Sequence, residues 1–234
     1  NFIKGFWIYV FSDEYKYKEK DKSYALTAEF VNERIILTRY KVDEESLTAQ
    51  ESQTIQKYTK IDDYRLEVSA SNQTDSYIIV VNQDAETIMI ENQIFNRAPS
   101  VTMADLQGKW MEKHSYTYAD TDKETFFLTR FSGDIAHYQD MDVDHAKKEY
   151  SIDPYPGCQR TITNGFIFEE TCPPTDKYPD PETYKWLITS FDRAEMILTQ
   201  VHLMEYMSTF EEKRVSDDYV LPSPPEGYKD VSEK

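Results

Sequence analysis

The chain has 234 residues, and its 43 acidic and 26 basic side chains give a formal net charge of −17 at pH 7. This acidity excludes a basic surface for nucleic-acid phosphates, and no apolar run reaches the length of a membrane-spanning helix. Two cysteines exclude a disulfide-dense scaffold, whereas a hydrophobic content of 39% suffices for a core and excludes global disorder.

The first half of the chain opens on Gly5-Phe6-Trp7 and continues in short runs that are typical of strands. Apolar residues alternate with polar ones from Tyr24 to Phe30, a period of two that places alternate side chains on one face of a strand. Further β-branched or aromatic runs cover residues 35–37, 64–68, 77–81 and 87–90. Short strands at this density predict an antiparallel barrel or sandwich.

A second copy of this unit begins at Gly108-Lys109-Trp110, about 103 residues after the first. Two of the six glycines and two of the three tryptophans lie at these two starts, which indicates a tandem duplication. Strand-like runs follow at 125–131, 161–168, 184–188 and 196–203, and residues 203–214 have near-helical spacing. We predict an all-β protein with two tandem small antiparallel β-barrels, residues 1–100 and 106–213, and an extended tail at 214–234.

Motifs of the first copy resemble those of the lipocalin family. Gly5-Phe6-Trp7 is similar to the Gly-x-Trp signature, Thr74-Asp75-Ser76-Tyr77 is similar to a Thr-Asp-Tyr stretch that opens a late strand, and Arg97 follows the last apolar run. The resemblance implies a calyx-shaped barrel whose floor is closed by Trp7, with Arg97 packed on that ring.

The second copy repeats this resemblance with Gly108, Trp110 and Arg214. Each copy is shorter than an ordinary lipocalin, so the resemblance implies a barrel with less interior volume. A local resemblance in the second copy concerns the CpcT/CpeT-type bilin lyases, to which Pro156-Gly157-Cys158, Phe166 to Cys172 and Asp192-Arg193 are similar in order. It implies a chromophore lyase as an alternative function.

Cys158 and Cys172 flank Asn164-Gly165, the strongest hairpin signal in the chain. With a two-residue turn Cys158 faces Thr171, so a one-residue bulge would set the cysteines opposite each other. We expect a disulfide, which indicates an oxidising, extracytoplasmic compartment. Two buried thiols, or one reactive cysteine, are the alternatives.

No metal site or catalytic motif stands out. Asp140, Asp142 and Asp144 form an acidic row, but the Ca²⁺-loop pattern fails because His145 occupies position six and Ser151 position twelve. The row is interpreted as a solvated face. The four histidines lack zinc-binding spacings, so we predict no metal, cofactor or catalytic residue and favour a non-catalytic role.

Aromatic side chains are the main functional candidates. Inward-facing members could line a ligand cavity, or they could fill the barrels; the candidates are Tyr24, Tyr77, Phe127, Tyr184 and Trp186. The sequence favours an extracytoplasmic, lipoprotein-like binding protein for a small apolar or aromatic molecule, with a lipid anchor on a segment preceding Asn1. The alternative is a structural or protein-interaction module with filled barrels.

Overall fold

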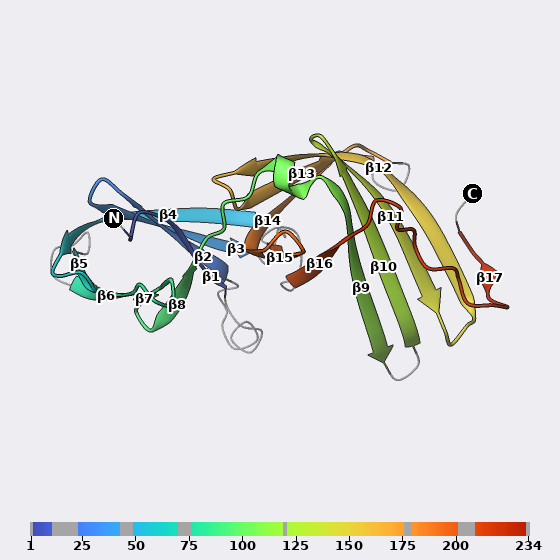
Figure 1. Ribbon diagram of the computed structural model, residues 1–234, viewed down its shortest axis with the longest axis horizontal. Helices are drawn as coiled ribbons and strands as arrows, with labels where there is room; N and C mark the ends of the chain where they lie inside the picture. Colours follow the sequence, from blue (N-terminus) through green and yellow to red (C-terminus); the bar gives the residue numbers. More distant parts are fainter. Residues whose placement is uncertain are drawn as a thin grey trace. The chain divides into compact units, whose positions relative to one another are not determined.

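The computed structural model describes residues 2–10, 23–42, 49–69, 76–118, 121–175, 179–200 and 209–232, and their strands form two compact units. One unit contains Asn1–Pro99, and the other contains Ser100–Leu198 and Thr209–Lys234. Each unit is a closed barrel of eight antiparallel strands, which confirms the predicted all-β class and the two barrels (Figure 1). No helix in the described parts of the chain is long and apolar enough to cross a bilayer.

In the first barrel each strand pairs with the next along the chain, and β8 returns to β1 to close the ring. The alternation seen in the sequence becomes an inner and an outer face: along β5, Leu66 and Val68 are buried while Arg65 and Glu67 are exposed. The strands are β1 (Gly5–Val10), β2 (Ser23–Val31), β3 (Arg34–Val42), β4 (Ala49–Lys60), β5 (Arg65–Ser69), β6 (Ser76–Asn82), β7 (Thr87–Ile90) and β8 (Gln93–Arg97).

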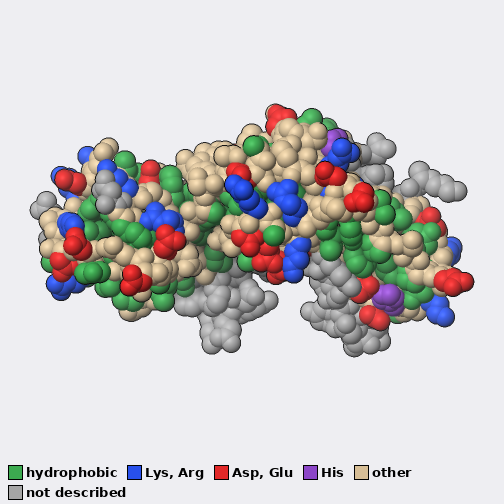
Figure 2. Space-filling model, in the orientation of Figure 1, with side chains coloured by type: hydrophobic (Ala, Val, Ile, Leu, Met, Phe, Trp, Pro, Cys, Tyr) green, Lys and Arg blue, Asp and Glu red, His purple; other side chains and the backbone are tan. Residues whose placement is uncertain are grey.

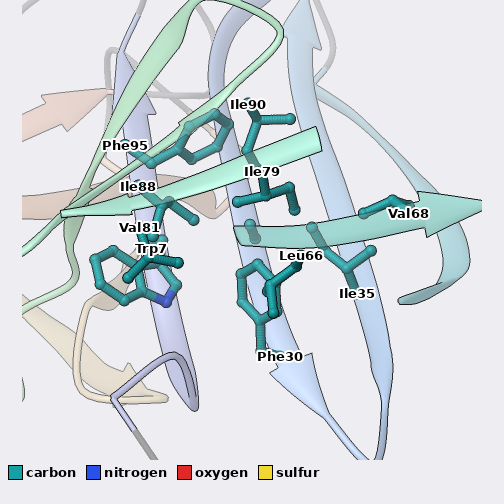
Figure 3. Packing of buried hydrophobic residues seen from close by; sticks show 11 residues of the cluster. Trp7, Phe30, Ile35, Leu66, Val68, Ile79, Val81, Ile88, Ile90 and Phe95 are labelled. Carbon is teal, nitrogen blue, oxygen red and sulfur yellow. The ribbon is translucent and has the colours of Figure 1, made fainter. Parts of the chain in front are cut away.

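Apolar side chains pack the interior of the first barrel (Figure 3). The ring centroids of Phe30 and Tyr58 lie 5.5 Å apart, and those of Tyr9 and Phe95 lie 5.6 Å apart. The described interior of this barrel therefore corresponds to the filled alternative. Its buried cluster consists of Trp7, Ala28, Phe30, Ile35, Leu66, Val68, Ile79, Val81, Ile88, Ile90 and Phe95.

The second barrel has the same order of neighbours, closed by pairing between β11 and β12. A short helix, α2 (Met103–Leu106), precedes it. Its strands are β9 (Gly108–Tyr118), β10 (Thr121–Ser132), β11 (Ile135–Asp144), β12 (Glu149–Thr163), β13 (Ile167–Cys172), β14 (Glu182–Phe191), β15 (Glu195–Gln200) and β16 (Thr209–Val215).

The near-helical spacing at 203–214 was a wrong guide for residues 209–214, which belong to β16. Lys213 and Arg214 of this strand pair with β9, and this tertiary pairing overrides a weak local period. Residues 203–208 lie outside the described part of the chain.

The chain after β16 follows the second barrel. Its short strand β17 (Lys229–Asp230) pairs in parallel with the start of β12, and the Tyr228 hydroxyl lies 2.9 Å from His145 Nδ1. Val231 N also donates to Tyr150 O at 2.8 Å. Acidic and basic side chains are interspersed over the visible faces of both units (Figure 2).

Candidate binding site in the second barrel

The floor of the first barrel is built around Trp7, which is fully buried and donates from Nε1 to Ile3 O at 3.0 Å. Arg97 is its partner on β8, and the guanidinium carbon lies 4.3 Å from the centre of the indole. Arg97 also donates from Nη1 to Lys4 O at 3.2 Å and from Nη2 to Phe2 O. The ring and the cation together close this end of the barrel.

The floor of the second barrel repeats these contacts. Trp110 is fully buried and donates to Leu106 O at 2.8 Å, and Arg214, its partner on β16, lies 4.4 Å from the indole centre. Arg214 donates to Gln107 O and Asp105 O, which precede Trp110 by the same numbers of residues as Lys4 and Phe2 precede Trp7.

The strand that carries each floor tryptophan begins with a glycine, because the backbone at that residue has a positive φ. Gly5 has a φ of 110° and Gly108 a φ of 107°, a conformation that side chains with a Cβ rarely adopt. A Cβ on Gly108 would also lie 3.3 Å from Arg214 Nη1. The structure thus brings Gly5, Trp7 and Arg97 together in one barrel, and their counterparts together in the other.

Cys158 and Cys172 form a disulfide, as expected, but the strand register differs from the prediction. The loop between β12 and β13 has three residues, with Asn164 and Gly165 both left-handed at φ values of 56° and 79°. The additional loop residue, Phe166, sets Cys158 directly opposite Cys172 without a bulge, with the two Cα atoms 4.3 Å apart. Because both sulfurs are bonded, thiol chemistry would first need a reductant.

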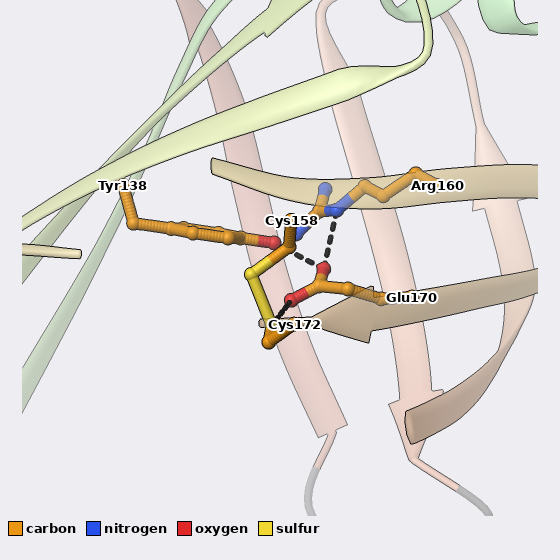
Figure 4. Close-up of a disulfide and its surroundings, with 5 residues drawn as sticks. All are labelled: Tyr138, Cys158, Arg160, Glu170 and Cys172. Atoms are coloured by element: carbon orange, nitrogen blue, oxygen red, sulfur yellow. Dashed lines mark hydrogen bonds and ion pairs between the residues drawn. A yellow bond between two sulfur atoms is a disulfide. The ribbon is translucent and has the colours of Figure 1, made fainter. Parts of the chain in front are cut away.

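A buried ion pair lies next to this disulfide (Figure 4). Arg160 is 3% exposed and donates from Nε to Glu170 Oε2, to which the Tyr138 hydroxyl also donates. The guanidinium carbon lies between 4.6 and 4.7 Å from the ring centres of Phe131, Phe168 and Tyr138. Burial lowers the pKa of Arg160 and raises that of Glu170, and each partner opposes the shift of the other.

Two further glutamates face the same interior. The register of Arg214 with Trp110 places Glu212 opposite Glu112, two residues above the floor, and the two residues are 7% and 8% exposed. Burial and the neighbouring Glu212 raise the pKa of Glu112 to about 8. Burial raises the pKa of Glu212 to about 7, with Glu170 adding to the shift and Arg160 opposing it.

Two charged residues of this polar group each have one buried atom without a hydrogen bond to any described residue. Glu212 Oε2 and Arg160 Nη1 are buried and have no hydrogen-bond partner among the described residues. A buried polar atom left in this way is expensive, on the order of 1–3 kcal/mol and more for a charged group. Such atoms are unusual in native cores, where most buried polar atoms are hydrogen-bonded.

The corresponding wall of the first barrel has no such charges. Counting two residues from the matched Trp and Arg, Glu112 and Glu212 take the places of Tyr9 and Phe95, whose rings contact each other. Counting along the hairpin strands from the floor, Arg160 and Glu170 take the places of Tyr58 and Val68, which are register partners in the first barrel.

Three of the predicted ligand residues face the interior of the second barrel. Phe127 lies opposite Glu112, Tyr184 opposite Glu170, and Trp186 opposite Phe168. All three are only partly buried although their register points them inward. The ring centroids of Tyr184 and Trp186 lie 5.6 Å apart in a stacked arrangement.

The other two ligand candidates do not join this site. Tyr77 belongs to the first barrel, where it packs against the apolar cluster and donates to Gln56 Oε1 at 2.6 Å. Burial, with Glu91 nearby, raises the pKa of Tyr77 to about 12. The side chain of Tyr24, together with Thr74 and Asp75 of the lipocalin-like motif, lies outside the described part of the structure.

Sequence reasoning missed the inner-wall residues Arg160, Glu170, Glu112 and Glu212. The sequence did contain a signal for their inward position, because side chains two residues apart on a strand share a face. Glu112 lies two residues after Trp110, and Glu212 lies two before Arg214. By the same count Arg160 follows Cys158 and Glu170 precedes Cys172.

The acidic row on β11 does not converge on one point. Asp140 is buried, whereas Asp142 is exposed and accepts from the Thr125 hydroxyl at 2.5 Å, and Asp144 accepts from Lys147. Within the described residues, the only group with metal-ligand spacing is Cys158, Glu170 and Cys172. In the disulfide these sulfurs are not thiolates, so this group offers no thiolate ligand to a metal.

Compared with known proteins, the chain matches no protein-family model and no curated sequence. Its site is therefore interpreted from its own geometry.

Proposed function

We propose that the protein is a non-catalytic small-ligand-binding protein in which the second barrel receives the ligand and the first barrel is structural. One observation carries this proposal. At matched positions the inner wall of the first barrel is uncharged, with two tyrosines, a phenylalanine and a valine, whereas that of the second carries Arg160, Glu170, Glu112 and Glu212.

Burying ionisable groups is costly even when they are paired, and well-packed apolar residues of similar volume often serve stability better. The first barrel closes on the same floor without them, so closing the fold does not require these charges. Buried charges with perturbed pKa values mark candidate functional sites. A ligand that uses the polar atoms accounts for their presence.

The ligand of this proposal is a small molecule with an apolar or aromatic body. Phe127, Tyr184 and Trp186 are inward by register and partly exposed, which supports contact with a guest molecule. The two matching floors support a lipocalin-like kinship, and the Cys158–Cys172 disulfide supports an extracytoplasmic location. The lipid anchor on a preceding segment stays a prediction.

Titration with the neutral fluorescent dye N-phenyl-1-naphthylamine tests the proposal. We expect saturable binding to the full chain, and an affinity at least fivefold lower in Tyr184→Ala. Tyr77→Ala is the matched control, because Tyr77 has the same register position in the first barrel. Absence of saturable dye binding, or equal losses in both variants, would overturn the assignment to the second barrel.

A second candidate function, association through the outer surface of the first barrel, is favoured by a different observation. Val80, Met89 and Ile94 are cross-strand neighbours on β6, β7 and β8, and they are 37%, 39% and 57% exposed. Contiguous exposed apolar side chains mark interaction surfaces. If copies associate through this row, sedimentation velocity will show a concentration-dependent dimer that Met89→Lys abolishes. A monomer at all concentrations argues against self-association.

A further inference from the structure

We infer that the second barrel binds an organic cation, whose charged nitrogen lies between Glu112 and Glu212 and whose body contacts the inward aromatic residues. This inference rests on the proposed ligand-binding function and names the chemical class of the ligand. It concerns the pair of glutamates and the aromatic wall beside it.

The inner wall of the second barrel carries more buried carboxyl groups than buried cations. Arg160 is the one buried cationic side chain in the described residues, and its Nε already donates to Glu170. Glu212 is 7% exposed, and its Oε2 has no hydrogen-bond partner within the described chain. An acceptor of this kind is satisfied by an N–H donor, and a positively charged donor also offsets the carboxylate charge.

The two glutamate side chains lie close enough to each other to interact electrostatically. Continued by one residue, the register of Lys213 with Met111 places Glu212 opposite Glu112 on the adjacent strand, and like charges in that position destabilise a sheet. A single cation between them converts this repulsion into two attractive contacts. The raised pKa values of both groups agree with a pair that holds protons when no cation is bound.

The surroundings of the glutamate pair favour an organic cation over a metal ion. A bound Ca²⁺ or Zn²⁺ needs four or more ligands, and the Glu112–Glu212 pair belongs to no group of three potential metal ligands among the described residues. Phe127 lies directly beside Glu112 on the neighbouring strand. A carboxylate pair next to an aromatic face suits an ammonium or guanidinium group, since the ring attracts a cation and the carboxylates accept its N–H donors.

The test compares three probes with the same ring and different charge: 2-phenylethylamine, 2-phenylethanol and phenylacetate. Isothermal titration of the full chain should show the amine binding at least tenfold more tightly than the alcohol, and the acid binding most weakly. Glu212→Gln should lower the amine affinity at least tenfold and so abolish the preference for the amine over the alcohol. Glu211→Gln, an exposed neighbour on β16, is the matched control and should change neither.

The outcomes separate the two levels of the proposal. If the dye binds but the alcohol or the acid matches the amine, the cation assignment is wrong and the binding function stands. If Glu212→Gln leaves amine binding unchanged, the site of the cation is wrong. If neither the dye nor any probe binds, the binding function and the cation assignment both fail.

Discussion

The two barrels share a floor and differ in their walls. Both pairs, Trp7 with Arg97 and Trp110 with Arg214, share an indole N–H bond to a backbone carbonyl and a guanidinium stacked on the indole, so both copies close in the same way. Two residues above the floor the first barrel continues with aromatic and aliphatic packing, whereas the second turns to carboxylates and a guanidinium. The comparison separates what the fold requires, the floor, from what only one copy carries, the charged wall.

The largest expected effect comes from breaking the charged wall at Arg160. In Arg160→Leu, Glu170 stays buried without its cation, and we expect the second barrel to lose about 3–5 kcal/mol of unfolding free energy. The double variant Arg160→Tyr/Glu170→Val installs the first-barrel residues and should recover most of that loss. Urea unfolding monitored by hydrogen exchange in peptides of each barrel measures both variants. A single variant within 1 kcal/mol of the wild type would show that the pair is not tightly coupled.

The disulfide is the next difference between the copies, since both cysteines of the chain lie in the second. Replacing Cys158 and Cys172 by serine opens a loop of about 15 residues and should lower the unfolding free energy of the second barrel by about 3 kcal/mol in the chain-entropy model. Peptides of the first barrel should exchange at unchanged rates. Equal changes in both barrels would contradict an effect local to the second.

The stability of the second barrel should depend on pH through Glu112 and Glu212, which have no ionisable carboxyl counterparts in the first barrel. Their pKa values in the folded state, about 8 and about 7, lie above the ordinary value of a glutamate. Between about pH 4.5 and 8 the folded state therefore holds protons that the unfolded state has released, so the contribution of these groups to stability falls as the pH rises through this window.

We expect the unfolding free energy of the second barrel to fall between pH 5 and pH 8 from this cause. Burial dominates both pKa shifts; Glu212 adds to the shift of Glu112, and for Glu212 the neighbouring Glu170 adds to the shift while Arg160 opposes it. The double variant Glu112→Tyr/Glu212→Phe, which copies the first barrel, should have a flatter profile, as measured by urea unfolding across this range. A wild-type stability that rises from pH 5 to pH 8 in this barrel would contradict the sign.

The fold was more accessible from the sequence than the site was. Gly and Trp are rare in this chain, so Gly5-Phe6-Trp7 and Gly108-Lys109-Trp110 marked the two starts, and strand periodicity established the class. Charged residues at alternate strand positions resemble a solvated face. Their inward direction becomes apparent only when positions are counted in steps of two from a residue known to point inward, such as Trp110. The three-residue turn escaped prediction because its third member, Phe166, is apolar and has no local turn signal.

The smallest expected effect tests the shared floor itself. Arg97 and Arg214 each stack on an indole and donate to two backbone carbonyl groups, which the planar guanidinium does at once and a lysine ammonium cannot. Arg97→Lys and Arg214→Lys should therefore each lower the unfolding free energy of their own barrel by about 1 kcal/mol, a magnitude typical of cation–π and hydrogen-bond contacts. Because both floors share these contacts, the two losses should agree within about 0.5 kcal/mol, close to the scatter of independent substitutions. A loss confined to one barrel would mean that equal geometry does not carry equal energy, and that the charged wall above Trp110 has altered the floor beneath it.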